Sequence, residues 1–205
     1  MNDKINQVLR TAILSVLGIV YLALIGVIFA FNINLEVAKG MQYTLHSVVI
    51  LSAFAYLFFV DLINNVEEDK ANGKMALIFG ALFTIPVLIG RVIGFTALSN
   101  ELKSINNILN FYGDVSVSRS IEMVAWTTFF PFSILYLAKI FYSKRKKILG
   151  ILCSISSACC FIAFLSFFSP SIIYTLIGVL GWGVLFTIII LIYLFEQIRC
   201  LHKSI

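Results

Sequence analysis

The stretch MALIFGALFTIPVLIGRVIGFTAL, residues 75–98, decides the fold class of this chain. It carries a single charged residue, Arg91, in an otherwise apolar run. A helix of about 20 such residues crosses the hydrocarbon core of a bilayer, whereas the buried helix of a soluble domain needs only about 10 to 14. The stretch therefore predicts a transmembrane helix.

Five more apolar runs, separated by polar segments, lie on either side of this one. The chain of 205 residues is 60% hydrophobic and only 12% charged, which leaves too little polar surface for a globule of this size in water. We therefore expect an all-α integral membrane protein, with six transmembrane helices in a compact bundle and a single domain over residues 1–205. The predicted spans cover residues 11–31, 44–63, 75–98, 121–142, 148–168 and 171–196.

Lysine and arginine are distributed unevenly over the segments between these spans. With the N-terminus in the cytoplasm, most of the 15 basic residues fall on the cytoplasmic side, and only Lys39, Lys103 and Arg119 fall outside. Because cytoplasmic loops carry the excess of basic residues, this pattern predicts that both termini are cytoplasmic. The many Ile, Lys and Asn residues are typical of an AT-rich bacterial genome, so we expect a multi-pass protein of a bacterial plasma membrane.

The connection between spans 3 and 4, residues 99–120, has a helical pattern of its own. Apolar residues recur in it at near-helical spacing, with polar residues between them: Leu102, Ile105, Leu109 and Tyr112. This spacing predicts a short amphipathic helix on the outer membrane surface. A disordered loop is the alternative.

Arg91 is the most informative charged residue, because an arginine inside a membrane span requires a partner, water or a lipid headgroup. Glu122, near the outer end of span 4, and His46, near the outer end of span 2, fall at a similar depth. We predict that these three residues form a polar cluster that binds a ligand. The alternative is that the long side chain of Arg91 extends to the headgroups.

Two prolines provide a physical reason for a cavity beside this cluster. Pro86 in span 3 and Pro131 in span 4 each lie roughly opposite the charged face of their helix. A proline ring displaces the carbonyl four residues earlier, so both positions are predicted to be kinks that leave the charged faces concave. We therefore expect an outward-facing pocket around Arg91.

The cytoplasmic side of the predicted bundle holds two further candidates. Asp61, near the end of span 2, is a candidate proton or cation site, because a carboxylate inside a membrane is costly. A solvated span end is the alternative, favoured by the polar residues that follow it. The loop after span 4 is expected to contact anionic phospholipid headgroups, and it is too short for a nucleic-acid interface. Its basic residues are Lys144, Arg145, Lys146 and Lys147.

The sequence contains no pattern typical of a catalytic or cofactor site. It lacks H-E-x-x-H, G-x-S-x-G, C-x-x-C and a glycine-rich phosphate loop. Its four cysteines lie within or at the ends of the last two spans, where neither a disulfide framework nor a metal site is expected. We therefore expect no catalytic residues, no metal and no cofactor.

Two classes of function remain open from the sequence. The first is a non-enzymatic accessory, immunity or sensory bundle that packs against lipid or an unspecified protein partner. The second is a protein that binds or transports a small anionic solute in the pocket around Arg91, with spans 3 and 4 moving. A membrane-embedded enzyme that acts on lipid is a third alternative.

Overall fold

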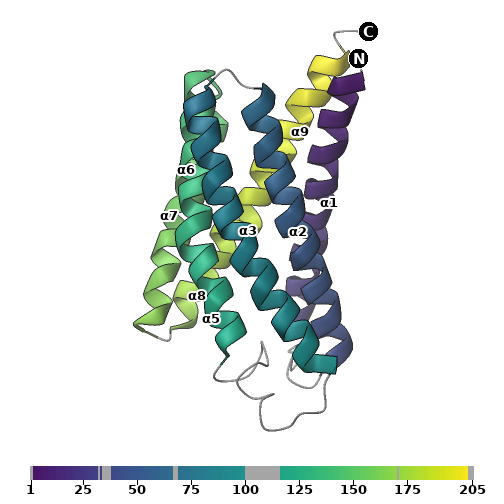
Figure 1. Cartoon of the computed structure of the whole chain (residues 1–205), viewed down its shortest axis with the longest axis vertical. Coiled ribbons are helices and arrows are strands. Elements are labelled where there is room, and N and C mark those ends of the chain that lie inside the picture. The colour runs from purple at the N-terminus through teal and green to yellow at the C-terminus, as the bar shows by residue number, and fades with distance from the viewer. Residues whose placement is uncertain are drawn as a thin grey trace.

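A computed structural model of the chain describes residues 2–31, 33, 38–66, 69–99, 116–169 and 171–202. These residues form helices and turns, with no strand among them. Six of the described helices are long and apolar enough to cross a membrane (Figure 1), which confirms the helical class and the six candidate spans. The predicted interfacial helix between spans 3 and 4 lies outside the described residues, because residues 100–115 are not among them.

The first three candidate spans are single α-helices, and the last three change helical type along their length. The single helices are α1 (Asn2–Ala30), α2 (Lys39–Val66) and α3 (Lys70–Ser99). Span 4 consists of α5 (Val117–Val124), the π-helix η1 (Ala125–Phe129) and α6 (Phe130–Ser143). Span 5 consists of α7 (Lys147–Ala163) and the 3-10 helix η2 (Phe164–Phe167). Span 6 consists of α8 (Ile172–Gly178), the π-helix η3 (Val179–Leu185) and α9 (Phe186–His202).

Span 4 begins earlier than the sequence pattern predicts. Ser116 caps the N-terminus of α5, and its hydroxyl accepts a hydrogen bond from the Arg119 N–H at 3.1 Å. Such a cap satisfies an amide that has no partner inside the helix. The first turn is polar, so hydropathy alone placed the start at residue 121. The earlier start adds the turn that carries Arg119 to the helix.

The helices pack in sequence order around a closed ring. Each candidate span contacts the next, and α1 at the start of the chain contacts α9 at its end. Because the described chain crosses the bundle six times, α1 begins and α9 finishes at the same end (Figure 1), which we call the terminus end. The opposite end, where α5 begins and α3 finishes, is called the distal end.

Tyr56 of α2 lies at the centre of this ring and joins four of its helices. Its hydroxyl donates a hydrogen bond to the Ser133 Oγ at 2.6 Å, and Ser133 donates to the Ala76 carbonyl at 2.7 Å. The rings of Phe83, Phe130 and Phe186 each lie with their centroids 5.3 Å from that of Tyr56. Buried aromatic pairs at this separation stabilise a core beyond the area they bury.

The two prolines have different local surroundings. Pro131 lacks the N–H that would bond the Thr127 carbonyl, and the turn before it is the π-helix η1, in which the Phe130 N–H donates to the Ala125 carbonyl. Helix α3 keeps its α-helical type through Pro86, from Lys70 to Ser99. Span 4 thus absorbs its proline by a change of helical type, a common response where the hydrogen-bond ladder is interrupted.

We expect Tyr56→Phe to lower the free energy of unfolding by about 1 kcal/mol, because only one buried hydrogen bond is lost. Tyr56→Ala should lower it by about 3–5 kcal/mol, because a cavity is left as well. Titration of the detergent-solubilised protein with sodium dodecyl sulfate, followed by circular dichroism, measures both. Tyr142→Phe is the control, since Tyr142 is 44% exposed. Equal losses for the two Tyr→Phe variants would contradict a central role for the Tyr56 hydroxyl.

Candidate functional site

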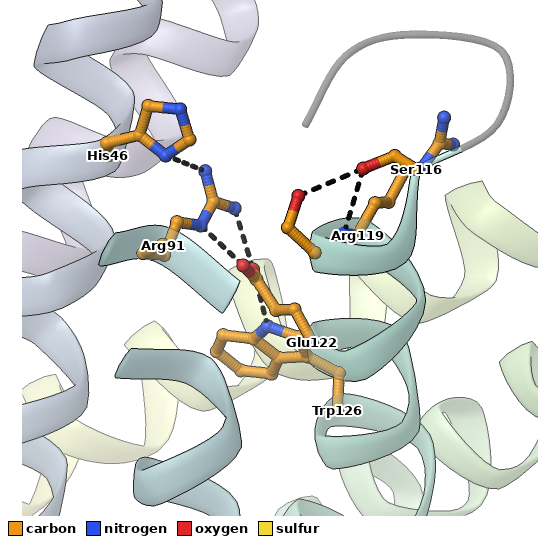
Figure 2. A network of polar contacts seen from close by, with 7 residues as sticks. His46, Arg91, Ser116, Arg119, Glu122 and Trp126 are labelled. Carbon is orange, nitrogen blue, oxygen red and sulfur yellow. Dashed lines mark hydrogen bonds and ion pairs between the residues drawn. The ribbon is translucent and has the colours of Figure 1, made fainter. Parts of the chain in front are cut away.

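His46, Arg91 and Glu122 lie together near the distal end, brought there by α2, α3 and α5 (Figure 2). The Arg91 Nε lies 2.5 Å from the Glu122 Oε2, and the Arg91 Nη2 donates to the Oε1 at 2.6 Å. The Arg91 Nη1 lies 3.5 Å from the His46 Nδ1. The Nη2 contact is a charge-assisted hydrogen bond, and the Nε contact brings the second carboxylate oxygen into the ion pair.

All three side chains are buried. Arg91 is 6% exposed, Glu122 4% and His46 0%. Arg91 of α3 therefore pairs with Glu122 inside the protein, and the helix that carries Glu122, α5, contacts α3. The Arg91 side chain does not extend to the surface. The structure brings the predicted residues together, and their role in binding a ligand stays a prediction.

Trp126 is a fourth member of the cluster, which the sequence analysis missed. Its indole N–H donates to the Glu122 Oε1 at 3.0 Å, from η1 one turn further along span 4. The spacing of four residues between a carboxylate and an indole is a usable signal, because such residues share a helix face. The same indole ring packs against the rings of Phe83 and Trp182, with centroids 4.5 Å away. Trp126 thus connects the ion pair to the aromatic core.

Gly90 allows α5 to approach α3 closely enough for the pair to form. A Cβ atom at Gly90 would lie 2.7 Å from the Ser118 carbonyl oxygen and 3.5 Å from the Glu122 Cβ. The first of these distances is shorter than van der Waals contact permits, so a side chain here would push the two helices apart. Small residues serve this purpose in packed membrane helices.

Three cavities of the structure lie apart from the cluster. A central cavity of about 50 Å³ lies inside the ring and has a mainly apolar lining that includes Tyr56 and Trp182. It has room for a few water molecules only. A larger cavity opens at the distal end and a third at the terminus end, and none of the three is lined by His46, Arg91 or Glu122. The expected pocket around Arg91 is therefore not among them.

Asp61, the predicted proton or cation site, lies toward the terminus end and is separate from this cluster. Asp61 is half-buried in α2, near the end of that helix. Among the residues that the structure describes, no group of three or more His, Cys, Asp or Glu side chains could hold a metal ion. Asp61 therefore has no such group around it in the described part of the chain, and its role as a proton or cation site stays a prediction.

In the basic loop, Lys146 contacts the protein, whereas Arg145 and Lys147 are exposed. The Lys146 Nζ lies 3.3 Å from the Glu196 Oε2 and 4.8 Å from the centre of the Tyr193 ring, so it is directed toward α9. Arg145 adopts a positive φ of 59° in the turn between α6 and α7 and is exposed, as is Lys147. Contact of this loop with anionic headgroups stays a prediction, with Arg145 and Lys147 placed best for it.

The chain matches no protein-family model, and no curated protein or solved structure is significantly similar to it. Its class follows from the fold and the cluster alone. It is a small all-helical protein whose six candidate spans form a ring closed around an aromatic core, with a buried ion pair near the distal end.

We expect Arg91→Ala to lower the free energy of unfolding by about 3–5 kcal/mol, because it leaves the Glu122 carboxylate buried without its cation. The double variant Arg91→Ala with Glu122→Ala should lose less than the single one. Lys146 and Glu196 form a matched control, since a partly exposed pair at 3.3 Å should show a coupling of at most about 1 kcal/mol. Additive losses at Arg91 and Glu122 would contradict a buried pair.

Gly90→Ala should also destabilise the protein, by about 1–3 kcal/mol, because its methyl group would overlap the Ser118 carbonyl. Gly26→Ala in α1 is the matched control, since nothing lies within 4 Å of a Cβ there. That change should leave stability equal or slightly higher, because alanine favours a helix. The same denaturant titration measures both variants. A tolerated Gly90→Ala would show that α3 and α5 do not approach this closely.

Proposed function

We propose that this chain is a non-enzymatic, multi-pass protein of a bacterial plasma membrane, with both termini in the cytoplasm. It acts as an accessory, immunity or sensory bundle by packing beside a protein partner in the plane of the membrane. The observation that carries the proposal is the pairing of Arg91 with Glu122 at 2.5 and 2.6 Å inside the ring. The interior charge serves the scaffold and is not presented to a solute.

Membrane insertion is supported by the outer surface of the ring. Large apolar side chains point outward along its helices, among them Phe58, Ile85 and Ile155, which are 56%, 55% and 47% exposed. A soluble monomer rarely exposes apolar surface on this scale. Covering this apolar surface with lipid or with the helices of a partner removes it from water, which is favourable.

Solute transport is the less favoured function. Arg91 would have to release Glu122 before it could take an anion, and both charges would then need new partners in a region of low dielectric constant. The central cavity, at about 50 Å³, offers no path for a solute larger than water. The contacts within the ring therefore support a fixed scaffold over a moving one.

The proposal is tested by photo-cross-linking in living cells. A photoreactive amino acid is placed at one of three exposed apolar positions on different helices: Val16 of α1, Ile85 of α3 or Ile155 of α7. We expect one of these faces to give a discrete adduct with a single protein, while the other two act as controls for random contact. An absence of adducts at all three positions would overturn the proposed partner.

A second measurement separates the scaffold from the transporter. The purified chain is reconstituted into liposomes, and uptake of radiolabelled phosphate, sulfate and acetate is compared with that of protein-free liposomes. We expect no difference. Uptake that Arg91→Ala abolishes would instead support the solute-transport alternative.

A further inference from the structure

A cavity of about 570 Å³ lies at the distal end, where the end of α1, the start of α5 and the segment from η2 to η3 meet. Its volume falls in the range of about 300–1,000 Å³ that is typical of small-molecule sites. It shares no lining residue with the central cavity. The described polar residues of its lining supply hydroxyl groups and a cation: Ser116, Arg119, Ser120, Ser166, Ser171 and Thr175.

Three of these polar groups are not engaged within the described part of the chain. The guanidinium of Arg119 and the hydroxyl groups of Ser166 and Thr175 make no hydrogen bond or ion pair there. They come from three different elements, α5, η2 and α8. Hydrogen-bond donors that converge on one cavity from separate elements are typical of a ligand site.

Arg119 does not pair with Glu122 of the same helix. Arg119 and Glu122 are three residues apart, a spacing at which opposite charges on a helix commonly pair. Glu122 is held by Arg91 and Trp126 instead. Figure 2 shows Arg119 extending away from that pair. Among the described residues that line the cavity there is a cation and no acidic side chain, which favours an anionic ligand.

The other half of the lining is apolar and reaches the outer surface of the ring. Phe29 of α1, together with Ile172 and Leu176 of α8, lines the cavity and is exposed as well. The cavity is thus continuous with the surface that lipid would cover. A ligand that fits both halves has an anionic head and an apolar tail.

We infer that this cavity is a binding site for an anionic phospholipid. Arg119 holds the phosphate, Ser166 and Thr175 donate hydrogen bonds to its oxygens, and the acyl chains run past Phe29 and Leu176 into the bilayer. The site lies at the end of the bundle opposite the basic loop, so it would serve the other leaflet. It is independent of any protein partner.

Binding of fluorescent phosphatidylglycerol to the full chain in dodecyl maltoside micelles tests this inference. We expect Arg119→Gln to weaken binding about tenfold or more, since a charge-assisted contact is lost. Arg119→Lys should retain most of the affinity. Arg10→Gln is the matched control, because it removes an exposed arginine near the start of α1, far from the cavity, and should leave binding unchanged. Circular dichroism checks that each variant is folded.

Two competitors identify the source of the anion. Phosphatidylcholine should compete about tenfold more weakly than unlabelled phosphatidylglycerol, because its head has no net charge. Glycerol phosphate should compete poorly, because it lacks the acyl chains that cover the apolar half. Equal binding by Arg119→Gln would overturn the site. Competition by glycerol phosphate as strong as that by the lipid would overturn the phospholipid and assign the cavity to a soluble phosphate.

Discussion

The ion pair between Arg91 and Glu122 is the constraint on which the distal half of this structure depends. An arginine in an apolar helix has to be neutralised where it lies, because moving it to water would unpack the helix around it. Glu122 can reach it only because Gly90 lets α5 approach α3. The pair contributes less to net stability than its short distances suggest, because both charges are desolvated. Its main effect is to fix which faces of α3 and α5 meet.

The pair is joined to the aromatic core through Trp126, which bonds Glu122 and packs on Phe83. Below it, Tyr56 and the phenylalanines around it fill the centre of the ring. The interior therefore consists of a small polar layer, which holds the ion pair, on an aromatic layer around Tyr56. The surfaces that remain for a partner or a ligand are the apolar sides of the ring and the cavity at its distal end.

The sequence by itself determined the class of the fold and the depth along the spans at which His46, Arg91 and Glu122 lie. Six apolar runs fix six helices, because hydropathy and helical length are local properties of the chain. The depths of His46, Arg91 and Glu122 follow from counting residues along the predicted spans, since the rise of a helix is constant. The same local reasoning failed at the start of span 4, where Ser116 caps a polar first turn that hydropathy does not detect.

Only the tertiary structure decided which neighbours these residues have. Two arrangements could not be obtained from spacing alone: the closure of the ring by α1 and α9, and the position of Arg119 at a cavity separate from the ion pair. Each depends on how helices are rotated and offset against one another. That choice is made by packing between segments far apart in the chain, such as Gly90 against Ser118, and no local pattern records it.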